Sequence, residues 1–258
     1  MKSLKQHIKE SFKIGKNKIV HYNYFPETRE ELQKIIMDRI KDNPNEDIID
    51  LNDIDVSQIT DMSKLFYGLD HYNIDISKWD VSKVTNMYGM FRGCKKFNGD
   101  LSYWNVKNVE DMSEMFYLCK KFNCDLSKWD VSNVKIMSFM FQACYEFEGK
   151  GLENWDVSNV EDMIGIFQNC KNFEGKGLEN WDVSNVTNMS WMFAGCINLD
   201  CDLSNWDVSN VTNMKYMFHE CDNFNCDLSN WNVSKVKNMH NMFYDCKSLK
   251  NKPSWYKE

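Results

Sequence analysis

The sequence predicts a solenoid of about eight stacked coils, each 25–26 residues long, behind a small αβ N-terminal cap. The first observation is a regularly spaced position, Ile54 in the first copy and tryptophan afterwards, at Trp79, Trp104, Trp129, Trp155, Trp181, Trp206 and Trp231. The second is the constant series of apolar residues that follows each tryptophan. A fixed period of 20–50 residues is typical of repeats that bury a shared core only by stacking.

The N-terminal cap is predicted to contain a basic helix, a short strand and a second helix. The first helix, over residues 3–14, carries an apolar stripe on one face and lysines on another. The strand is predicted at residues 19–22. The second helix is predicted over residues 29–41, because Thr28 and Glu31 form a capping box before apolar residues at helical spacing. Its face toward the first coil is expected to contain Leu32, Ile36 and Ile40.

The basic N-terminal helix has two interpretations. In the first, it packs its apolar stripe on the domain and leaves its lysines in solvent. In the second, residues 1–18 attach the protein to an acidic partner or make peripheral contact with a membrane. The stretch lacks the apolar segment of a secretory signal, and no run of about 18 apolar residues follows. We therefore expect no membrane span and, by default, a cytoplasmic location.

Each coil is expected to combine an extended corner with a short helical turn. Trp104 and Val106 lie two residues apart and share a face, as in a strand, with Asn105 on the other side. The later Met-Phe-x-x-Cys-x-x-Phe spacing predicts about one helical or 3₁₀ turn. Taken together, the domain boundaries are a cap at residues 1–50, coils at residues 51–252 and a C-terminal tail at residues 253–258.

Two coils and the end of the chain depart from the common pattern. One extra residue is present in each of the Glu-Gly-Lys-Gly segments at residues 148–151 and 174–177. The two glycines in each segment permit a bulge without backbone strain. At the C-terminal end, Pro253 is expected to blunt the last coil and Trp255 to fold over its core.

Ten cysteines raise the question of disulfides, but seven share one repeat position that Leu69 fills in the first coil. These seven are Cys94, Cys119, Cys144, Cys170, Cys196, Cys221 and Cys246. A position shared by Cys and Leu indicates a small apolar core site, so reduced and buried thiols are expected there. Cys124, Cys201 and Cys226 share a second position, typical of a turn, where thiols are expected to be more exposed.

The ionisable residues do not form a recognisable catalytic or metal-binding pattern. The five histidines do not recur in register. A column of aspartates would suit a cation, but turn residues are its ordinary explanation; it contains Asp100, Asp125, Asp202 and Asp227. We therefore expect no enzyme, no cofactor and no bound metal. The net charge of −7 also argues against a nucleic-acid partner.

Two sets of positions are candidates for a contact surface. A uniform Asp/Ser/Asn strip, seen at Asp130, Ser132 and Asn133, serves either as a structural ladder or as a surface for a repetitive ligand such as a glycan. The ladder is favoured, because these side chains readily satisfy local backbone. The positions around the methionine pair vary between copies and are often aromatic, which favours a protein partner. The candidate contact residues are Tyr88, Tyr117, Phe139, Trp191, Tyr216 and Tyr244.

Two segments of the repeat resemble a known family. The segment Leu101-x-x-Trp104-x-Val106 follows the L-x-x-L-x-L pattern of leucine-rich repeats. Downstream, Val-Thr-x-Met-x-x-Met-Phe-x-x-Cys-x-x-Phe, as in Val211 to Phe224, resembles the BspA-like class of these repeats, found in mycoplasma lipoproteins and bacterial surface proteins. The resemblance implies an α/β repeat that forms a right-handed leucine-rich-repeat-like solenoid with a strand-lined face.

The same resemblance implies a non-enzymatic scaffold for protein binding or adhesion, located at the cell surface. Two alternatives stay open beside it: a structural or virion-associated component attached through the basic N-terminal helix, and a glycan-binding surface. The opening Met-Lys-Ser-Leu-Lys-Gln-His-Ile-Lys-Glu-Ser also looks like leaders that begin many gut-bacteriophage proteins. The location is therefore open between cytoplasm, cell surface and virion.

Overall fold

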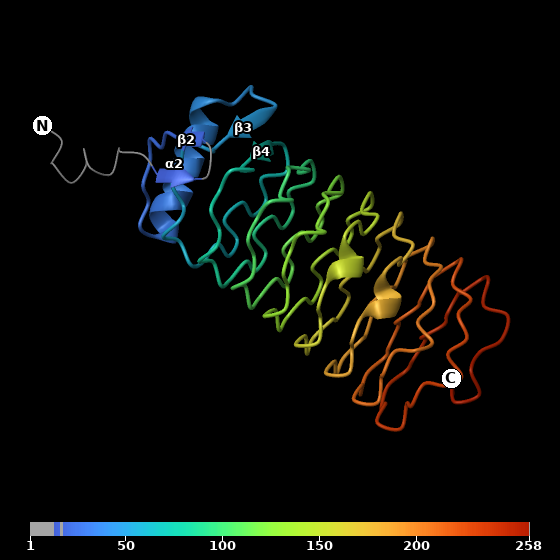
Figure 1. Cartoon of the computed structure of the whole chain (residues 1–258). Coiled ribbons are helices and arrows are strands. Elements are labelled where there is room, and N and C mark those ends of the chain that lie inside the picture. The colour runs from blue at the N-terminus through green and yellow to red at the C-terminus, as the bar shows by residue number, and fades with distance from the viewer. Residues whose placement is uncertain (1–12, 16–17, 258) are drawn as a thin grey trace, which may run out of the picture.

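The computed structural model describes residues 13–15 and 18–257 of the 258-residue chain. Its regular elements are few: β1 (Lys13–Gly15), β2 (Lys18–Val20), α2 (Arg29–Asp42), β3 (Ile48–Asp50), β4 (Asn73–Asp75) and the 3₁₀ helices η1 (Leu152–Asn154) and η2 (Leu178–Asn180). The rest of the chain winds as coils that lie side by side from α2 to the C-terminus (Figure 1).

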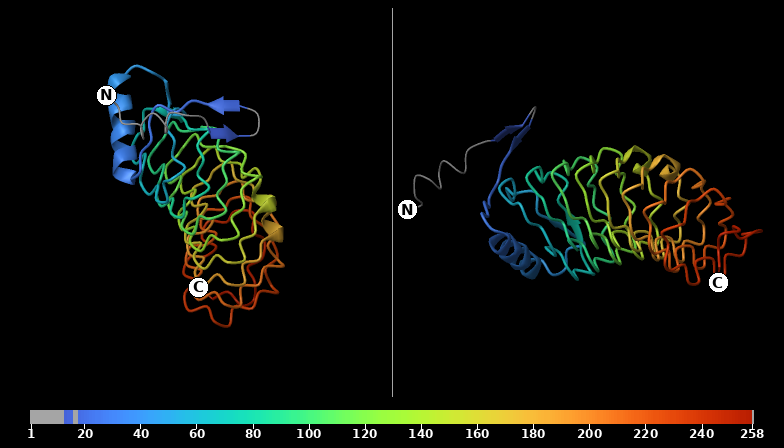
Figure 2. Two further views of the ribbon diagram at one scale, coloured as in Figure 1. Left: turned by 60° about the vertical axis from the view of Figure 1, so that its left-hand side comes forward. Right: turned by 90° about the horizontal axis from the view of Figure 1, so that it is seen from below.

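The chain enters the stack through an antiparallel hairpin formed by β1 and β2 (Figure 2). The helix predicted over residues 3–14 lies mostly outside the described residues, and it is wrong at Lys13 and Ile14, which belong to β1. Gly15 pairs with Lys18 at the hairpin turn instead of ending a helix. The strand predicted at residues 19–22 is correct only in its first half.

α2 confirms the second predicted helix and extends it by one residue. The Thr28 hydroxyl accepts a hydrogen bond from the Glu31 amide at 3.2 Å, while the Glu31 carboxylate accepts one from the Glu27 amide at 2.8 Å. The helix lies at the N-terminal end of the stack (Figure 2) and contributes the predicted face, Leu32, Ile36 and Ile40, to the core. Among the described residues, no helix has the length and apolar character that a bilayer crossing requires.

Neighbouring coils are joined by parallel backbone pairing one repeat apart. β3 and β4 pair in this way, and isolated bridges continue the series at the residue before the first methionine of each coil. The bridging residues are Asp61, Asn86, Asp111, Ile136, Asp162, Asn188, Asn213 and Asn238. The pairing between coils therefore does not lie at the Trp-x-Val corner, for which a strand is predicted. At that position of the first coil, Ile54 pairs with Tyr24 of the cap.

The Trp-x-Val corner keeps the side-chain alternation of a strand without its hydrogen bonding. Trp104 and Val106 are buried and Asn105 is exposed, as predicted. Their coil satisfies its amides locally, because Trp104 donates to the Leu101 carbonyl at 3.1 Å and Lys107 donates to the Asn105 side chain at 3.3 Å. These local bonds leave little for a ladder with the neighbouring coil.

The segment from the first methionine to the cysteine is a ribbon of tight turns, not the predicted helical turn. In the first coil, alternate amides donate to the next coil at Met62, Lys64, Phe66 and Gly68. The amides between them donate three residues back within their own coil at Leu65, Tyr67 and Leu69. Lys64 and Gly68 have φ values of 54° and 76°, which a right-handed helix does not contain. We call this segment of each coil the turn ribbon.

Like side chains stack in columns along the core. The phenylalanine rings from Phe66 to Phe243 follow one another at centroid distances of 5.4–5.8 Å. Each tryptophan indole of the core column donates to the coil before it, as from Trp129 to the Leu101 carbonyl at 3.0 Å. Trp255, although one residue out of register, stacks on Trp231 at 6.3 Å and so covers the last core layer as predicted.

The cysteine column confirms the predicted apolar core site. Its thiols donate to the phenylalanine carbonyl of the preceding coil, as from Cys144 to Phe116 at 3.0 Å. Burial raises the pKa of the Cys94 thiol to about 12. The second cysteine position behaves unevenly: Cys201 and Cys226 are half-buried, whereas Cys124 is buried, contrary to the prediction. The sulfurs of Cys124 and Cys226 both accept a hydrogen bond at 3.3 Å, from the amides of Leu101 and Leu203.

The two insertions form η1 and η2, which lie next to each other on one edge of the stack (Figure 1). Gly151 and Gly177, which precede them, have φ values of 98° and 88°. A Cβ atom on Gly151 would lie 2.2 Å from the Ser127 amide nitrogen, so only glycine fits. The predicted role of these glycines is thus confirmed.

Candidate functional site

Two columns of the turn ribbon have a left-handed backbone in every coil, and we call the first of them, which contains aromatic residues, the left-handed column. It is the second residue after the first methionine, with φ between 52° and 62°, at Lys64, Gly89, Glu114, Phe139, Gly165, Trp191, Tyr216 and Asn241. A left-handed conformation costs an L-residue about 1–2 kcal/mol, whereas glycine adopts it freely. Since two copies are glycine, the fold does not require the aromatic residues found at three others.

The aromatic residues of the last three coils form a continuous surface, which we call the aromatic patch: Trp191, Tyr216, His219, His240 and Tyr244. Trp191 stacks on Tyr216 at 4.1 Å between ring centroids. His219 lies 5.3 Å from Tyr216 and stacks on Tyr244 at 5.1 Å, and His240 meets Tyr216 edge-on at 5.6 Å. Tyr244 is 58% exposed and the rings of Trp191 and Tyr216 are half-buried. The patch is therefore fixed by ring contacts while one side remains open to a partner.

Phe139 lies in the same column but outside the aromatic patch. Its ring covers Gly165 in the next coil, where a Cβ atom would come within 2.6 Å of the ring. Gly165 thus provides the space that the Phe139 ring occupies. Because Gly165 has no side chain, it separates Phe139 from Trp191 along the column.

The tyrosines of the N-terminal coils have cationic neighbours. The Arg92 guanidinium lies 4.6 Å from the Tyr117 ring and 5.8 Å from the Tyr67 ring, and it forms an ion pair with Glu114. In the same way, the Lys64 ammonium lies 4.9 Å from the Tyr88 ring. The aromatic patch has one such contact too, because the Lys215 ammonium lies 4.9 Å from the Tyr216 ring. What distinguishes the patch is therefore the contact of its rings with one another, which Tyr88 and Tyr117 lack in the described part of the chain.

The structure thus brings together Trp191, Tyr216 and Tyr244 of the six candidate contact residues, and it leaves Tyr88, Tyr117 and Phe139 apart. Sequence reasoning missed His219 and His240, which it treated as scattered surface histidines. A signal was available in the repeat: His219 follows its phenylalanine as Tyr117 and Tyr244 do, and His240 aligns with Tyr88.

The uniform Asp/Ser/Asn strip is a hydrogen-bonded ladder, which confirms the favoured interpretation. The Asn133 side-chain amide donates to the Lys107 carbonyl of the preceding coil at 2.8 Å, and the Asp130 carboxylate accepts the Ser132 amide at 3.2 Å. The same donation recurs at Asn108, Asn159, Asn185 and Asn210.

The acidic column also has a local structural role. Each aspartate accepts the amide of the serine two residues later, as in Asp100 to Ser102 at 2.9 Å, and the set continues at Asp125, Asp202 and Asp227. Within the described part of the chain, no three His, Cys, Asp or Glu residues are arranged to hold a metal ion.

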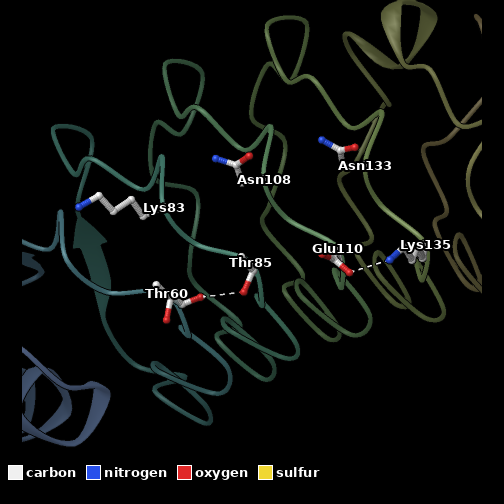
Figure 3. A pocket seen from close by; sticks show the side chains of 7 residues that line it. All are labelled: Thr60, Lys83, Thr85, Asn108, Glu110, Asn133 and Lys135. Atoms are coloured by element: carbon white, nitrogen blue, oxygen red, sulfur yellow. Dashed lines mark hydrogen bonds and ion pairs between the residues drawn. The ribbon is translucent and has the colours of Figure 1, made fainter.

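A polar groove of about 540 Å³ lies along the first coils (Figure 3). It runs between the row of ladder asparagines, Asn108 and Asn133, and the row that contains Thr85 and Glu110. It is lined by Thr60, Lys83, Thr85, Asn108, Glu110, Asn133 and Lys135. Its polar groups are paired within the protein. Lys135 and Glu110 form an ion pair at 2.8 Å, Thr85 donates to the Thr60 carbonyl at 3.3 Å, and Lys83 donates to the Gln58 side chain at 3.0 Å. Few polar groups of the groove are therefore free to bind a ligand.

Comparison with known proteins identifies a repeat family. The family described as "Mycoplasma protein of unknown function, DUF285" matches residues 35–151 and, in a second overlapping copy, residues 135–256. No curated protein and no solved structure matches the chain significantly. The two matches cover most of the chain and run through the coils described above. The chain is therefore a repeat protein that belongs to the DUF285 family of mycoplasma proteins.

Proposed function

We propose that this protein is a non-enzymatic binding scaffold and that the aromatic patch is its contact surface for a protein partner. The observation that carries the proposal is the placement of Trp191 and Tyr216 at left-handed positions, with φ values of 62° and 58°. Glycine serves the fold at the same position in other coils, so the fold itself does not require a large aromatic side chain there.

The surroundings of the aromatic patch favour protein binding. The stacked core holds each coil in place, so the rings lose little conformational freedom when a partner binds. Tryptophan and tyrosine are enriched among the residues that dominate the energy of protein interfaces. The five rings of the aromatic patch also lie on one side of the stack, which suits a partner that contacts three coils at once.

We further propose that the coils are a right-handed solenoid of the BspA-like leucine-rich-repeat type, acting in adhesion at a surface. The repeat length, the single N-terminal cap and the parallel bridges between coils support this classification. The bridges at Asp111 and Ile136, rather than at the Trp-x-Val corner, are the point at which this chain departs from the L-x-x-L-x-L pattern.

The test starts from a probe that does not depend on knowing the partner. Peptides are selected from a random library displayed on phage against the full-length protein, and their Kd is measured by fluorescence anisotropy. Trp191→Ala should weaken binding about tenfold or more, as expected for a buried aromatic anchor. Tyr103→Ala is the matched control, because Tyr103 is 74% exposed and lies outside the aromatic patch; its Kd should not change.

Two results would contradict the proposal. In the first, the selected peptides bind the wild type, Trp191→Ala and Tyr216→Ala with the same Kd. In the second, no peptide is enriched but a carbohydrate array binds the wild type and loses signal with Trp191→Ala, which assigns the aromatic patch to a glycan. Circular dichroism of each variant shows whether the fold is retained.

A further inference from the structure

The last coil presents a row of backbone amides that have no hydrogen-bond partner among the described residues: Met239, Asn241, Phe243 and Asp245. In the coil before it, the equivalent amides all donate to this last coil, at 2.8–3.0 Å, from Met214, Tyr216, Phe218 and Glu220. Among the described residues no following coil satisfies these donors, as one does for the equivalent amides elsewhere in the stack. We call this row the donor edge.

The donor edge presents hydrogen-bond donors, whereas the opposite end of the stack presents acceptors. The bonds from alternate amides of the turn ribbon all run toward the C-terminal end, so the opposite end of the stack presents carbonyl groups. There, the Arg29 side chain donates to the Ser63 carbonyl at 2.7 Å and so places a cation against the acceptors. Two copies meeting through their donor edges would set amide against amide, which disfavours a symmetric dimer.

The side chains beside the donor edge are only partly covered. Val233, Val236 and Met239 are half-buried, whereas Val208, Val211 and Met214 in the preceding coil are at most 1% exposed. The tail covers a different part of this layer, because Trp255 and Tyr256 pack on Trp231 and Phe243. An apolar strip therefore accompanies the unpaired amides.

The charge of the chain reverses at this end. Residues 232–258 contain six lysines and two acidic residues, a net charge of +4. Residues 21–231 contain 19 basic and 35 acidic residues, a net charge of −16. Lys235 and Lys237 flank Val236 in the sequence, and both are exposed. The partner that this surface favours electrostatically is therefore acidic.

We propose that the donor edge docks an extended acidic segment of another protein. Its backbone carbonyls accept hydrogen bonds from the four free amides, as in strand addition to a sheet edge. Its carboxylates lie toward Lys235 and Lys237, and an apolar side chain on its inner face covers Val236 and Met239. This site is independent of the aromatic patch, because it uses groups that point along the stack rather than outward from it.

The test uses the full-length protein and a fluorescein-labelled peptide of alternating Glu and Val, about ten residues long to match one strand. Lys235→Glu/Lys237→Glu should raise its Kd about tenfold or more. The matched control is Lys83→Glu/Lys135→Glu, which changes the same two repeat positions and the net charge by the same amount, but in the first coils. The control should keep the wild-type Kd.

Hydrogen exchange measured by mass spectrometry tests the amides themselves. Residues 239–245 should exchange faster than residues 214–220 in the free protein, and they should gain protection when the peptide is added. Equal loss of binding in both double variants, absence of binding, or protection gained elsewhere would overturn the proposal. So would dimer formation through this end in sedimentation experiments, since a second copy would then occupy the edge. Trp191→Ala should leave this binding unchanged.

Discussion

Trp191 combines two opposing properties at the scale of a single residue. Its indole stacks on Tyr216 at 4.1 Å, which stabilises the surface, but its backbone has a φ of 62°. The ring contact is worth about 0.5–1.5 kcal/mol, and the left-handed backbone costs a similar amount. Trp191 thus contributes close to zero net free energy to the stability of the fold, and its favourable contribution comes from binding a partner.

Comparing two small substitutions separates the backbone cost from the loss of the ring. Trp191→Gly and Trp191→Ala both remove the indole, but only Ala keeps the Cβ atom that the left-handed region disfavours. Trp191→Gly should therefore be the more stable by about 1 kcal/mol in urea unfolding. Tyr103 is the control, because its φ is not positive, and there Gly should be the less stable of the two. The same order at both positions would contradict the strain argument.

Sequence reasoning identified which residues are buried but not which have an unusual backbone. The core columns were predictable, because Trp, Met and Phe recur at fixed positions and stack only in one register. The left-handed column was harder to find, because Phe139, Trp191 and Tyr216 are residues that normally avoid it. Glycine at positions 89 and 165 was the signal, and it becomes informative only when copies are compared.

At the scale of the coil, the turn ribbon shows why side-chain spacing alone predicts the wrong element. Met112 and Met115 lie three residues apart, which suits a 3₁₀ turn as well as it suits the observed alternation of right- and left-handed residues. A 3₁₀ turn and the observed turn ribbon differ in the direction of their backbone amides. The spacing of the apolar residues carries no information about that direction. The corner at Trp104 was mispredicted for the same reason, since turn bonds and a strand place Trp104 and Val106 on one face alike.

The buried cysteines of the turn ribbon should make the protein sensitive to alkali. The unfolded chain loses each thiol proton near the ordinary pKa of 9.0, whereas folded Cys94 keeps its proton until about pH 12. Between these values the unfolded state binds fewer protons, so stability should fall by about 1.4 kcal/mol per pH unit for each such thiol. Cys94→Ala removes one thiol, so its stability deficit relative to wild type should shrink steadily as the pH rises above about 9.

Urea unfolding monitored by tryptophan fluorescence at several pH values measures that deficit. Val134→Ala is the control, because it also removes a fully buried side chain but no ionisable group. Its deficit should not depend on pH. A deficit for Cys94→Ala that stays constant up to about pH 11 would show that the thiol titrates normally in the folded chain.

At the scale of the whole molecule, stability depends on contacts between neighbouring coils. Phe141 stacks between Phe116 at 5.7 Å and Phe167 at 5.8 Å, whereas Phe243 at the end of the same column has Phe218 on one side and the tail residue Tyr256 on the other. The repeat period predicted this stacked arrangement. It could not predict how each end is covered, because the ends lie outside the repeat.

Equal substitutions at these two positions should therefore have unequal effects. Phe141→Ala should cost about 4 kcal/mol, because a large cavity opens between two full coils. Phe243→Ala should cost less than half of that and mainly expose the last coil, since only one complete neighbour is lost. Urea unfolding gives the two free energies, and hydrogen exchange shows whether the loss is local. Equal costs would mean that the stack unfolds as a single cooperative unit without weaker ends.

The left-handed column has a consequence for how such a protein changes over generations. Its backbone is the same whether the residue is Lys64, Gly165 or Trp191, so each coil offers one outward position that can be rewritten without disturbing the columns beneath it. Duplication of a coil adds another such position at a fixed pitch. New binding specificities can then arise from single substitutions at this position in several coils, while the residues of the core stay the same.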